Sequence, residues 1–158
     1  MRRILAVLML LASWSVSLAA ETITGRVIRC VDGDTLTVLS RGKIVKVRLA
    51  GVDCPERKQV GGLEAKQFTT DLTLGKRVSV AVAARPDRYG RSLGTVTLPD
   101  GRNLNQELLR AGHAWWYKAY SKDKSLQALE DSARAARAGL GALETPVPVP
   151  PWDFRRKR

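Results

Sequence analysis

The chain has 158 residues and carries 27 Lys and Arg residues against 15 Asp and Glu residues, a formal net charge of +12. This length allows one compact domain. The positive charge favours polyanionic partners such as nucleic acid, anionic lipid or acidic polysaccharide, although a basic protein without such a partner has the same composition. Two Cys and one His are too few to complete a four-ligand zinc site, which argues against a zinc-stabilised module.

The first 19 residues have the three-part pattern of a secretory signal peptide. Arg2 and Arg3 form a positive start, an apolar run follows over residues 4–11, and small residues precede a cleavage position after Ala19. The alternative is a retained membrane anchor, which would need about 20 apolar residues. We expect cleavage and an exported protein, periplasmic or secreted, with no stable membrane insertion. Loss of the two arginines lowers the net charge to +10.

Alternation of apolar and polar residues predicts five short strands, over residues 22–31, 35–39, 44–49, 76–83 and 92–98. Helical spacing predicts a helix over 63–74, a short one capped by Asn103 and ending at Gly112, and an alanine-rich one over 125–138. This order of elements predicts an α+β, mainly β fold, namely a five-stranded OB-fold barrel with three helices.

We expect residues 20–145 to form the folded domain. Residues 146–158 are rich in Pro and basic residues and lack periodicity, so we expect an extended or disordered tail. Cys30 and Cys54 both lie in the exported part. An oxidising compartment favours a disulfide between them, and two buried free thiols are the alternative.

Three polar stretches lie at strand ends or in loops, where functional sites are commonly built. They are Asp32-Gly33-Asp34-Thr35, the stretch from Arg48 to Glu56, and the stretch from Asp87 to Arg91. Taken singly, each fits an ordinary turn, a solvated strand residue or a basic surface loop. Together on one barrel they indicate phosphodiester hydrolysis, because carboxylates can hold a divalent cation and arginines can neutralise charge on phosphoryl oxygens.

These motifs, in this order and at this spacing, resemble those of the staphylococcal nuclease (thermonuclease) family, and the resemblance spans residues 22–140. It implies an exported bacterial hydrolase, a phosphodiesterase that cleaves DNA and RNA at the 5′ P–O bond and leaves 3′-phosphate ends. It also implies dependence on Ca²⁺. We expect the protein to be a monomer.

The resemblance implies a calcium site built from hard oxygen donors. Asp34 and Asp53 match the two carboxylate ligands, and the backbone carbonyl of Cys54 matches the third protein ligand. Water and phosphate would complete the shell. Asp32 matches a carboxylate that holds metal-bound water.

The same resemblance assigns the reaction to three further side chains. Glu56 matches the general base, which orients or deprotonates the attacking water. Arg48 and Arg91 match the two arginines that hold the phosphate. A general acid for the leaving 5′ oxygen is not evident in the sequence.

Four residues match substrate contacts of the family. Arg88 and Tyr89 match positions that touch the terminal phosphate and the sugar. Tyr117 and Tyr120 lie near base-contacting tyrosines, although packing in the core explains these aromatic residues equally well.

Some positions lie outside the motifs or depart from the family. His113 is expected to be structural, and Asn105 matches a residue that braces the site loops by hydrogen bonds. The loop over residues 57–62 is shorter than in the staphylococcal enzyme. Gly141 stands where many members have a tryptophan, and Trp152 in the tail could fold back to compensate.

Two other functions remain open from the sequence. One is a catalytically silent OB-fold module that only binds nucleic acid or another polyanion, which need not retain the carboxylates and both arginines together. The other is a basic structural or cell-surface protein, which leaves the three motifs unexplained.

Overall fold

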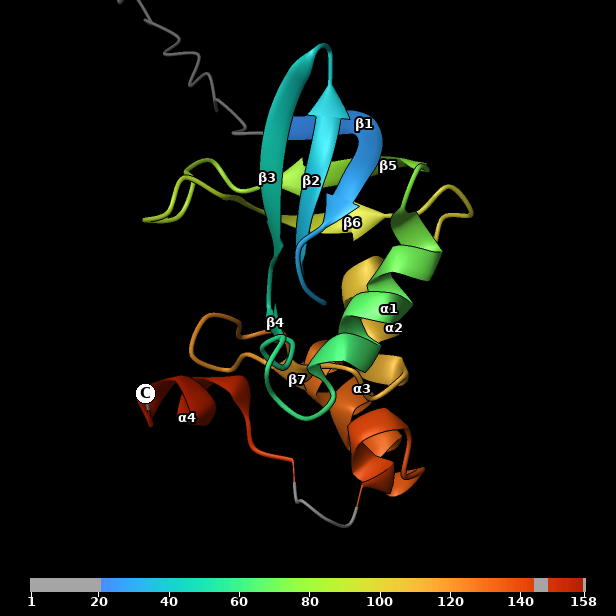
Figure 1. Ribbon diagram of the computed structural model, residues 1–158, viewed down its shortest axis with the longest axis vertical. Coiled ribbons are helices and arrows are strands. Elements are labelled where there is room, and N and C mark those ends of the chain that lie inside the picture. The colour runs from blue at the N-terminus through green and yellow to red at the C-terminus, as the bar shows by residue number, and fades with distance from the viewer. Residues whose placement is uncertain (1–20, 144–147, 158) are drawn as a thin grey trace, which may run out of the picture.

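The structure is a computed structural model that describes residues 21–143 and 148–157. Its centre is a closed barrel with the strand order β1-β2-β3-β6-β5 (Figure 1). The strands are β1 (Glu21–Cys30), β2 (Thr35–Ser40), β3 (Lys43–Leu49), β5 (Arg77–Val82) and β6 (Ser92–Thr97). Every expected strand is present with its ends within one residue, so the predicted five-stranded OB-type barrel is confirmed.

Pairings at both edges close the barrel. β1, β2 and β3 form an antiparallel meander, β3 pairs with β6 in parallel, and β1 pairs with β5 antiparallel. Alternate residues of each strand point inward, and Val27, Leu36, Val38 and Val47 are fully buried. The β2–β3 register places Arg48 opposite Thr35, so the start of β2 and the end of β3 meet at one rim of the barrel.

Helices gather at one end of the barrel, as Figure 1 shows for α1 (Gly62–Thr73), α2 (Leu104–Arg110) and α3 (Lys124–Ala135). Asn103 and Asp123 cap α2 and α3, because their side chains accept hydrogen bonds from backbone N–H groups of the first turn. The three expected helices are therefore confirmed, although the third ends at Ala135 and the 3₁₀ helix η1 (Gly139–Ala142) follows it. Among the described helices, none combines the length and apolar character needed to cross a membrane.

A two-stranded sheet that the sequence does not predict lies next to the barrel. β4 (Val52–Asp53) pairs with β7 (Trp115–Trp116), and Asp53 is the partner of Trp115. The backbone N–H of Tyr117 extends the contact by donating to the carbonyl of Gly51 at 2.9 Å. Strands of two residues are too short for a period-2 pattern to reveal them. This pairing holds the aromatic segment 115–117 against the segment that carries Asp53.

The C-terminal segment corrects our expectation of an extended or disordered tail. Residues 148–150 lead into the helix α4 (Pro151–Arg156). Pro151 is buried at the first helical position, where a missing backbone N–H costs nothing. Trp152 folds back, as the sequence suggested, and stacks on the ring of Tyr117. Six residues are too few to show helical periodicity, which explains why the composition was misleading.

The expected disulfide is also wrong for this structure. Cys30 and Cys54 are both free and buried, which is the alternative that we considered. The Cys30 sulfur lies 3.4 Å from the hydroxyl oxygen of Thr73 on α1, whereas Cys54 packs against Gly33. Burial, reinforced by the nearby Asp34 carboxylate, raises the pKa of the Cys54 thiol well above its usual value, so this thiol stays protonated.

The expected signal peptide, residues 1–19, lies outside the described residues and stays a prediction. The same holds for the proposed domain boundaries at residues 20 and 145, and for residues 146, 147 and 158 of the tail.

Candidate active site

The candidate site begins where β2 starts and β3 ends. Asp34 directly precedes β2, and Arg48 is the last residue but one of β3. The backbone carbonyl of Asp34 accepts a hydrogen bond from the N–H of Leu49 at 2.9 Å, which holds the two strand ends together. Asp34 and Arg48 are 5% and 9% exposed. The first two sequence motifs therefore meet at the barrel rim, largely shielded from solvent.

The guanidinium of Arg48 gathers the carboxylates of these motifs. Its Nη2 lies 2.7 Å from Oδ1 of Asp53 and 3.1 Å from Oδ2 of Asp34. Its Nη1 donates to the backbone carbonyls of Leu49 and Val52, both at 2.8 Å. Burial alone would lower the pKa of Arg48, but the Asp34 and Asp53 carboxylates outweigh burial and raise it. Arg48 is therefore a charged residue that organises the site.

Asp34 is held in place by two further donors. Its Oδ2 accepts a hydrogen bond from the backbone N–H of Cys54 at 2.7 Å, and its Oδ1 accepts one from the hydroxyl of Thr35 at 3.2 Å. Gly33 makes this packing feasible, because a Cβ at that position would lie 2.8 Å from the Cβ atoms of Ala65 and Cys54. The Asp-Gly-Asp motif thus needs its glycine for close approach as well as for the turn.

Negative charge is crowded at this rim. Burial, together with the neighbouring Asp34 carboxylate, raises the pKa of Asp32 to about 7. Burial also raises the pKa of Asp53, although hydrogen bonds and charge from Arg155 and Arg48 oppose that rise. Desolvation and like charges both disfavour ionised carboxylates, and a nearby cation relieves both effects. The rim therefore favours the binding of positive charge.

The donors at the rim fit an oxygen-preferring divalent cation. Asp34 and Asp53 each place an oxygen within 3.1 Å of one Arg48 nitrogen, so the two oxygens lie close together. Carboxylate and backbone carbonyl oxygens are the ligands that Ca²⁺ prefers. Over residues 21–143 and 148–157, no group of three or more His, Cys, Asp or Glu side chains is placed to hold a metal. A calcium site would thus need the Cys54 carbonyl, water and substrate to complete two carboxylates.

Glu56 is positioned by the loop that leads into α1. Its backbone N–H donates to Oε1 of Gln59 at 3.1 Å. At Gly62, the first residue of α1, a Cβ would lie 2.0 Å from the Glu56 carbonyl oxygen, so the helix start packs directly on this backbone. The Glu56 side chain is 38% exposed, which leaves its carboxylate accessible to water.

Arg155 on α4 is a site residue that sequence reasoning missed. Its Nη2 lies 2.7 Å from Oδ2 of Asp53, and its Nη1 lies 2.8 Å from Oε1 of Glu56. One guanidinium thus joins the two carboxylates. The only sequence signal was the spacing of Trp152 and Arg155, three positions apart, which places them on one face if the segment is helical.

The third motif forms a compact turn in the β5–β6 loop. Oδ1 of Asp87 accepts hydrogen bonds from the backbone N–H groups of Tyr89 and Arg91, both at 2.9 Å, and its Oδ2 lies 2.7 Å from Nε of Arg91. The guanidinium carbons of Arg88 and Arg91 lie 4.9 Å and 5.3 Å from the centre of the Tyr89 ring.

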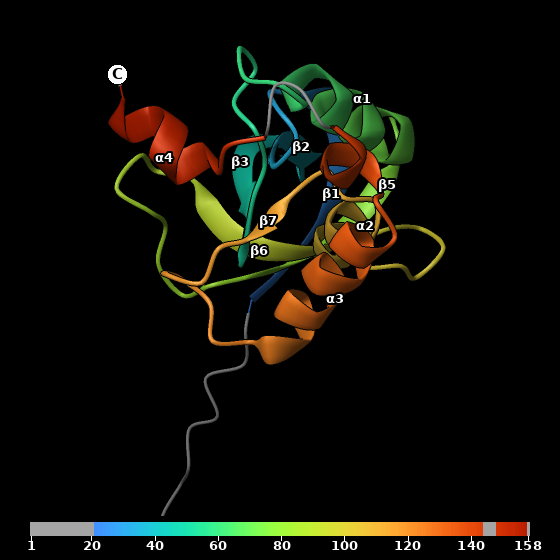
Figure 2. The same ribbon diagram turned by 90° about the horizontal axis from the view of Figure 1, so that it is seen from below.

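This turn is not joined to the carboxylates of the other two motifs. In the described part of the chain, no hydrogen bond or ion pair links Arg91 to them. In Figures 1 and 2 the β5–β6 loop projects on the side of the molecule where α4 lies. The structure thus brings Asp34, Asp53, Arg48 and Glu56 together, and leaves Arg91, Arg88 and Tyr89 as a separate cluster.

Aromatic residues continue from β7 along the site. Trp115 is 6% exposed and belongs to the interior, whereas Tyr120 is 77% exposed. The Tyr117 ring lies 4.7 Å from that of Tyr120 and 5.5 Å from that of Trp152, centre to centre, and is within 6° of parallel to the Trp152 ring. Tyr120 is therefore a surface aromatic and Tyr117 a half-buried one next to it, whereas core packing accounts for Trp115.

Two residues predicted to be structural have that role. The Asn105 side chain is buried, and its amide nitrogen donates to the carbonyls of Ala50 at 2.8 Å and Gly94 at 3.2 Å. It thereby ties the loop after β3 to β6, which is the predicted bracing role. The His113 ring packs on Phe68 with centres 4.9 Å apart, and burial lowers its pKa.

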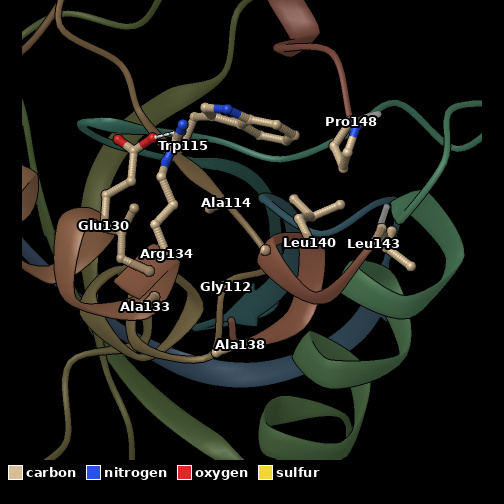
Figure 3. Close-up of a pocket in the computed structure, with 12 residues that line it drawn as sticks. Gly112, Ala114, Trp115, Glu130, Ala133, Arg134, Ala138, Leu140, Leu143 and Pro148 are labelled. Atoms are coloured by element: carbon tan, nitrogen blue, oxygen red, sulfur yellow. Dashed lines mark hydrogen bonds and ion pairs between the residues drawn. The ribbon is translucent and has the colours of Figure 1, made fainter. Parts of the chain in front are cut away.

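A cavity of about 190 Å³ lies apart from these motifs, between α2, α3 and η1. Figure 3 shows Glu130 and Arg134 on one side of it and Leu140, Leu143 and Pro148 on the other, with Trp115 across the top. Gly141 is also part of its wall. None of the residues predicted for chemistry lines this cavity, so we do not assign it to the reaction.

Comparisons with known proteins agree with the motifs. A family model described as "Staphylococcal nuclease homologue" matches residues 46–142. The chain is 42% identical over 158 residues to an "Uncharacterized endonuclease" of Escherichia coli O157:H7, covering 100% of both chains. It is 39% identical over 140 residues to a "Micrococcal nuclease" of Shigella flexneri, covering 84% of this chain and 80% of that one. An "Uncharacterized endonuclease" of Haemophilus influenzae is 39% identical over 138 residues, covering 87% and 76%.

Proposed function

The chain belongs to the staphylococcal nuclease family, and we propose that it is a calcium-dependent nuclease that hydrolyses DNA and RNA and leaves 5′-hydroxyl and 3′-phosphate ends. One observation carries the proposal: Asp34 and Asp53 converge on a single nitrogen of Arg48 at the barrel rim, at 3.1 Å and 2.7 Å. Two buried carboxylates held next to a fixed guanidinium suit a metal-assisted attack on a phosphodiester.

The metal would be held by Asp34, Asp53 and the carbonyl of Cys54, with Asp32 nearby to hold water. A bound calcium ion would supply positive charge to the scissile phosphate and orient it. Arg48, always charged and planar, stabilises the negative charge that develops on the phosphoryl oxygens. Arg91 has the same task in the proposal, with Asp87 bracing it through the 2.7 Å contact.

Glu56 acts on the attacking water in the proposed mechanism. Its partly exposed carboxylate accepts the proton as the water oxygen bonds to phosphorus. The bond between phosphorus and the 5′ oxygen breaks, and that oxygen keeps the electron pair and takes a proton from solvent. The products are a 3′-phosphate and a 5′-hydroxyl.

The proposed substrate contacts come from two groups of residues. Arg88 and Tyr89 in the β5–β6 turn suit the terminal phosphate and sugar, because the cationic groups lie 4.9 to 5.3 Å from the Tyr89 ring centre. Tyr120 suits base stacking because it is 77% exposed, and the half-buried ring of Tyr117 lies next to it. We further propose that the protein is exported, to the periplasm or the medium, and acts as a monomer.

A direct assay tests the proposal against its alternatives. The mature chain, beginning at residue 20, is incubated with end-labelled single-stranded DNA or RNA, either with calcium or with a chelator. We expect cleavage only with calcium, and 3′-phosphate ends identified by mass spectrometry. Binding without cleavage would support a catalytically silent OB-fold module instead. Absence of both would support a basic structural protein.

A further inference from the structure

α4 packs on the candidate active site through two different contacts. Arg155 lies between the carboxylates of Asp53 and Glu56, and Trp152 lies parallel to the ring of Tyr117. A spacing of three residues puts both side chains on the same face of the helix. The neighbouring Arg156 is 78% exposed and pairs with Asp153 on α4 itself. The face of α4 that meets the site is therefore distinct from its solvent face.

Arg155 contacts carboxylate oxygens that a bound metal ion and its water would need. Oδ1 of Asp53 is 2.7 Å from Arg48, and Oδ2 is 2.7 Å from Arg155. Both oxygens of the expected metal ligand are thus engaged by guanidinium groups. The second nitrogen of Arg155 contacts Glu56, so the expected general base is engaged as well. Asp53 is 1% exposed, and an ionised carboxylate so buried requires a cation beside it.

Trp152 covers a surface suited to a nucleobase. Its ring is within 6° of parallel to that of Tyr117, with centres 5.5 Å apart. An offset parallel stack of this kind is how aromatic side chains hold the bases of single strands. The face of Tyr117 that Trp152 covers is therefore closed to a base while α4 stays in place.

The segment before α4 is attached to the loop that carries Glu56. The side chain of Gln59 accepts a hydrogen bond from the backbone N–H of Glu56 and donates one to the backbone carbonyl of Val149. Pro151 is buried at the helix start. These contacts position α4 next to the site, and the opposite face of the helix is exposed to solvent. Arg155 itself is 40% exposed, so its contact is one that a ligand can displace.

We propose that α4 is a built-in competitor of the metal ion and the nucleic acid. In the ligand-free protein Arg155 neutralises the site carboxylates and Trp152 covers Tyr117. Calcium together with single-stranded nucleic acid displaces α4, because the metal replaces the charge of Arg155 and a base replaces the ring of Trp152. This inference rests on the proposed function, and it adds that α4 closes the site in most molecules until the ligands bind.

Calcium affinity measures the competition without relying on turnover. Titration calorimetry of the mature protein with CaCl₂ alone is compared for the parent, Arg155→Gln and Arg156→Gln. The two variants lose the same charge from the same helix, but only Arg155 contacts Asp53 and Glu56. A competitor reduces the apparent calcium affinity in proportion to the fraction of molecules in which α4 leaves the site open. We therefore expect about tenfold tighter calcium binding in Arg155→Gln and little change in Arg156→Gln.

Amide hydrogen exchange provides the second readout. We expect exchange of residues 152–157 to speed up when calcium and a hydrolysis-resistant phosphorothioate oligothymidine are added, while α2 stays protected. The proposal that α4 competes with the ligands is overturned by either of two results. One is calcium binding in Arg155→Gln that is equal to or weaker than in the parent, and the other is unchanged exchange protection of α4 when both ligands are present. If none of the three proteins binds calcium, both the calcium-dependent function and the competition by α4 are contradicted. If cleavage requires calcium but the parent and both variants bind calcium equally well, the role of α4 as a competitor is wrong and the proposed function stands.

Discussion

The Oδ2 atom of Asp34 accepts a hydrogen bond from the backbone N–H of Cys54 at 2.7 Å, across 20 positions of the sequence. This bond joins Asp34, in the turn before β2, to the residue that directly follows Asp53 of β4, so it links the two expected metal carboxylates. A buried hydrogen bond to a charged group contributes about 1.5–3 kcal/mol. It holds Asp34 and Asp53 in register without a disulfide.

Both cysteines should be measurable as free thiols in the purified protein. We expect two thiols per chain when protein purified without reductant is denatured and titrated with a thiol reagent, because Cys30 and Cys54 are both unbridged and buried. The melting temperature should be the same with and without dithiothreitol. If no thiols are titrated and the melting temperature is lower in reductant, the disulfide between Cys30 and Cys54 is present after all.

Arg48→Lys should lower both stability and activity. Lysine keeps the positive charge, but its single nitrogen cannot contact two carboxylates and two carbonyls at once. We expect the free energy of unfolding to fall by about 2–4 kcal/mol and cleavage to fall about 100-fold or more. Urea denaturation and a cleavage assay measure the two effects. Arg29→Lys, on the exposed side of β1, is the matched control. Parental stability in Arg48→Lys would contradict the shared-guanidinium geometry.

Glu56→Gln should separate chemistry from folding. Loss of the proposed general base is expected to lower kcat by about 10²- to 10⁴-fold. The side chain is 38% exposed, so the lost ion pair with Arg155 should change the free energy of unfolding by less than about 1 kcal/mol. Rates at saturating calcium and thermal melts measure the two quantities, with Glu64→Gln on the exposed face of α1 as the control. Full activity would remove Glu56 as the base.

The barrel and the core of the site were predictable because both depend on local patterns. Alternation marks each strand, and the motifs that carry Asp34 and Arg48 resemble those of a known family; the β2–β3 register then places both residues at one rim. Asn105 was predictable for a different reason. The family resemblance outside the motifs covers its position, and its buried amide makes the predicted bracing bonds.

Other features depend on contacts that no local pattern records. Arg155 and Asp53 are 102 positions apart, and the helix that joins them is too short to show periodicity. The β4–β7 pairing consists of two-residue strands. The expected disulfide is absent because Cys30 and Cys54 pack against different partners, and spacing along the chain does not give the geometry that a bridge requires. Cys30 instead faces Thr73 of α1.

Gly62→Ala tests whether the start of α1 positions Glu56. The added Cβ would lie 2.0 Å from the Glu56 carbonyl oxygen, so the loop must move. Alanine in a helix is otherwise favoured over glycine by up to about 1 kcal/mol, which makes any loss of stability a measure of the clash. We expect the free energy of unfolding to fall by about 1–3 kcal/mol and the cleavage rate to fall with it, because Glu56 is displaced.

Gly141→Ala is the matched control for this clash. A Cβ at Gly141 would meet its nearest heavy atom at 3.5 Å, an ordinary contact, so we expect nearly parental stability and rate. Both variants are compared by urea denaturation and by cleavage of single-stranded DNA at saturating calcium. If Gly62→Ala keeps the parental rate while losing stability, the position of Glu56 does not depend on α1. If it loses neither, the close approach between α1 and the Glu56 backbone is wrong.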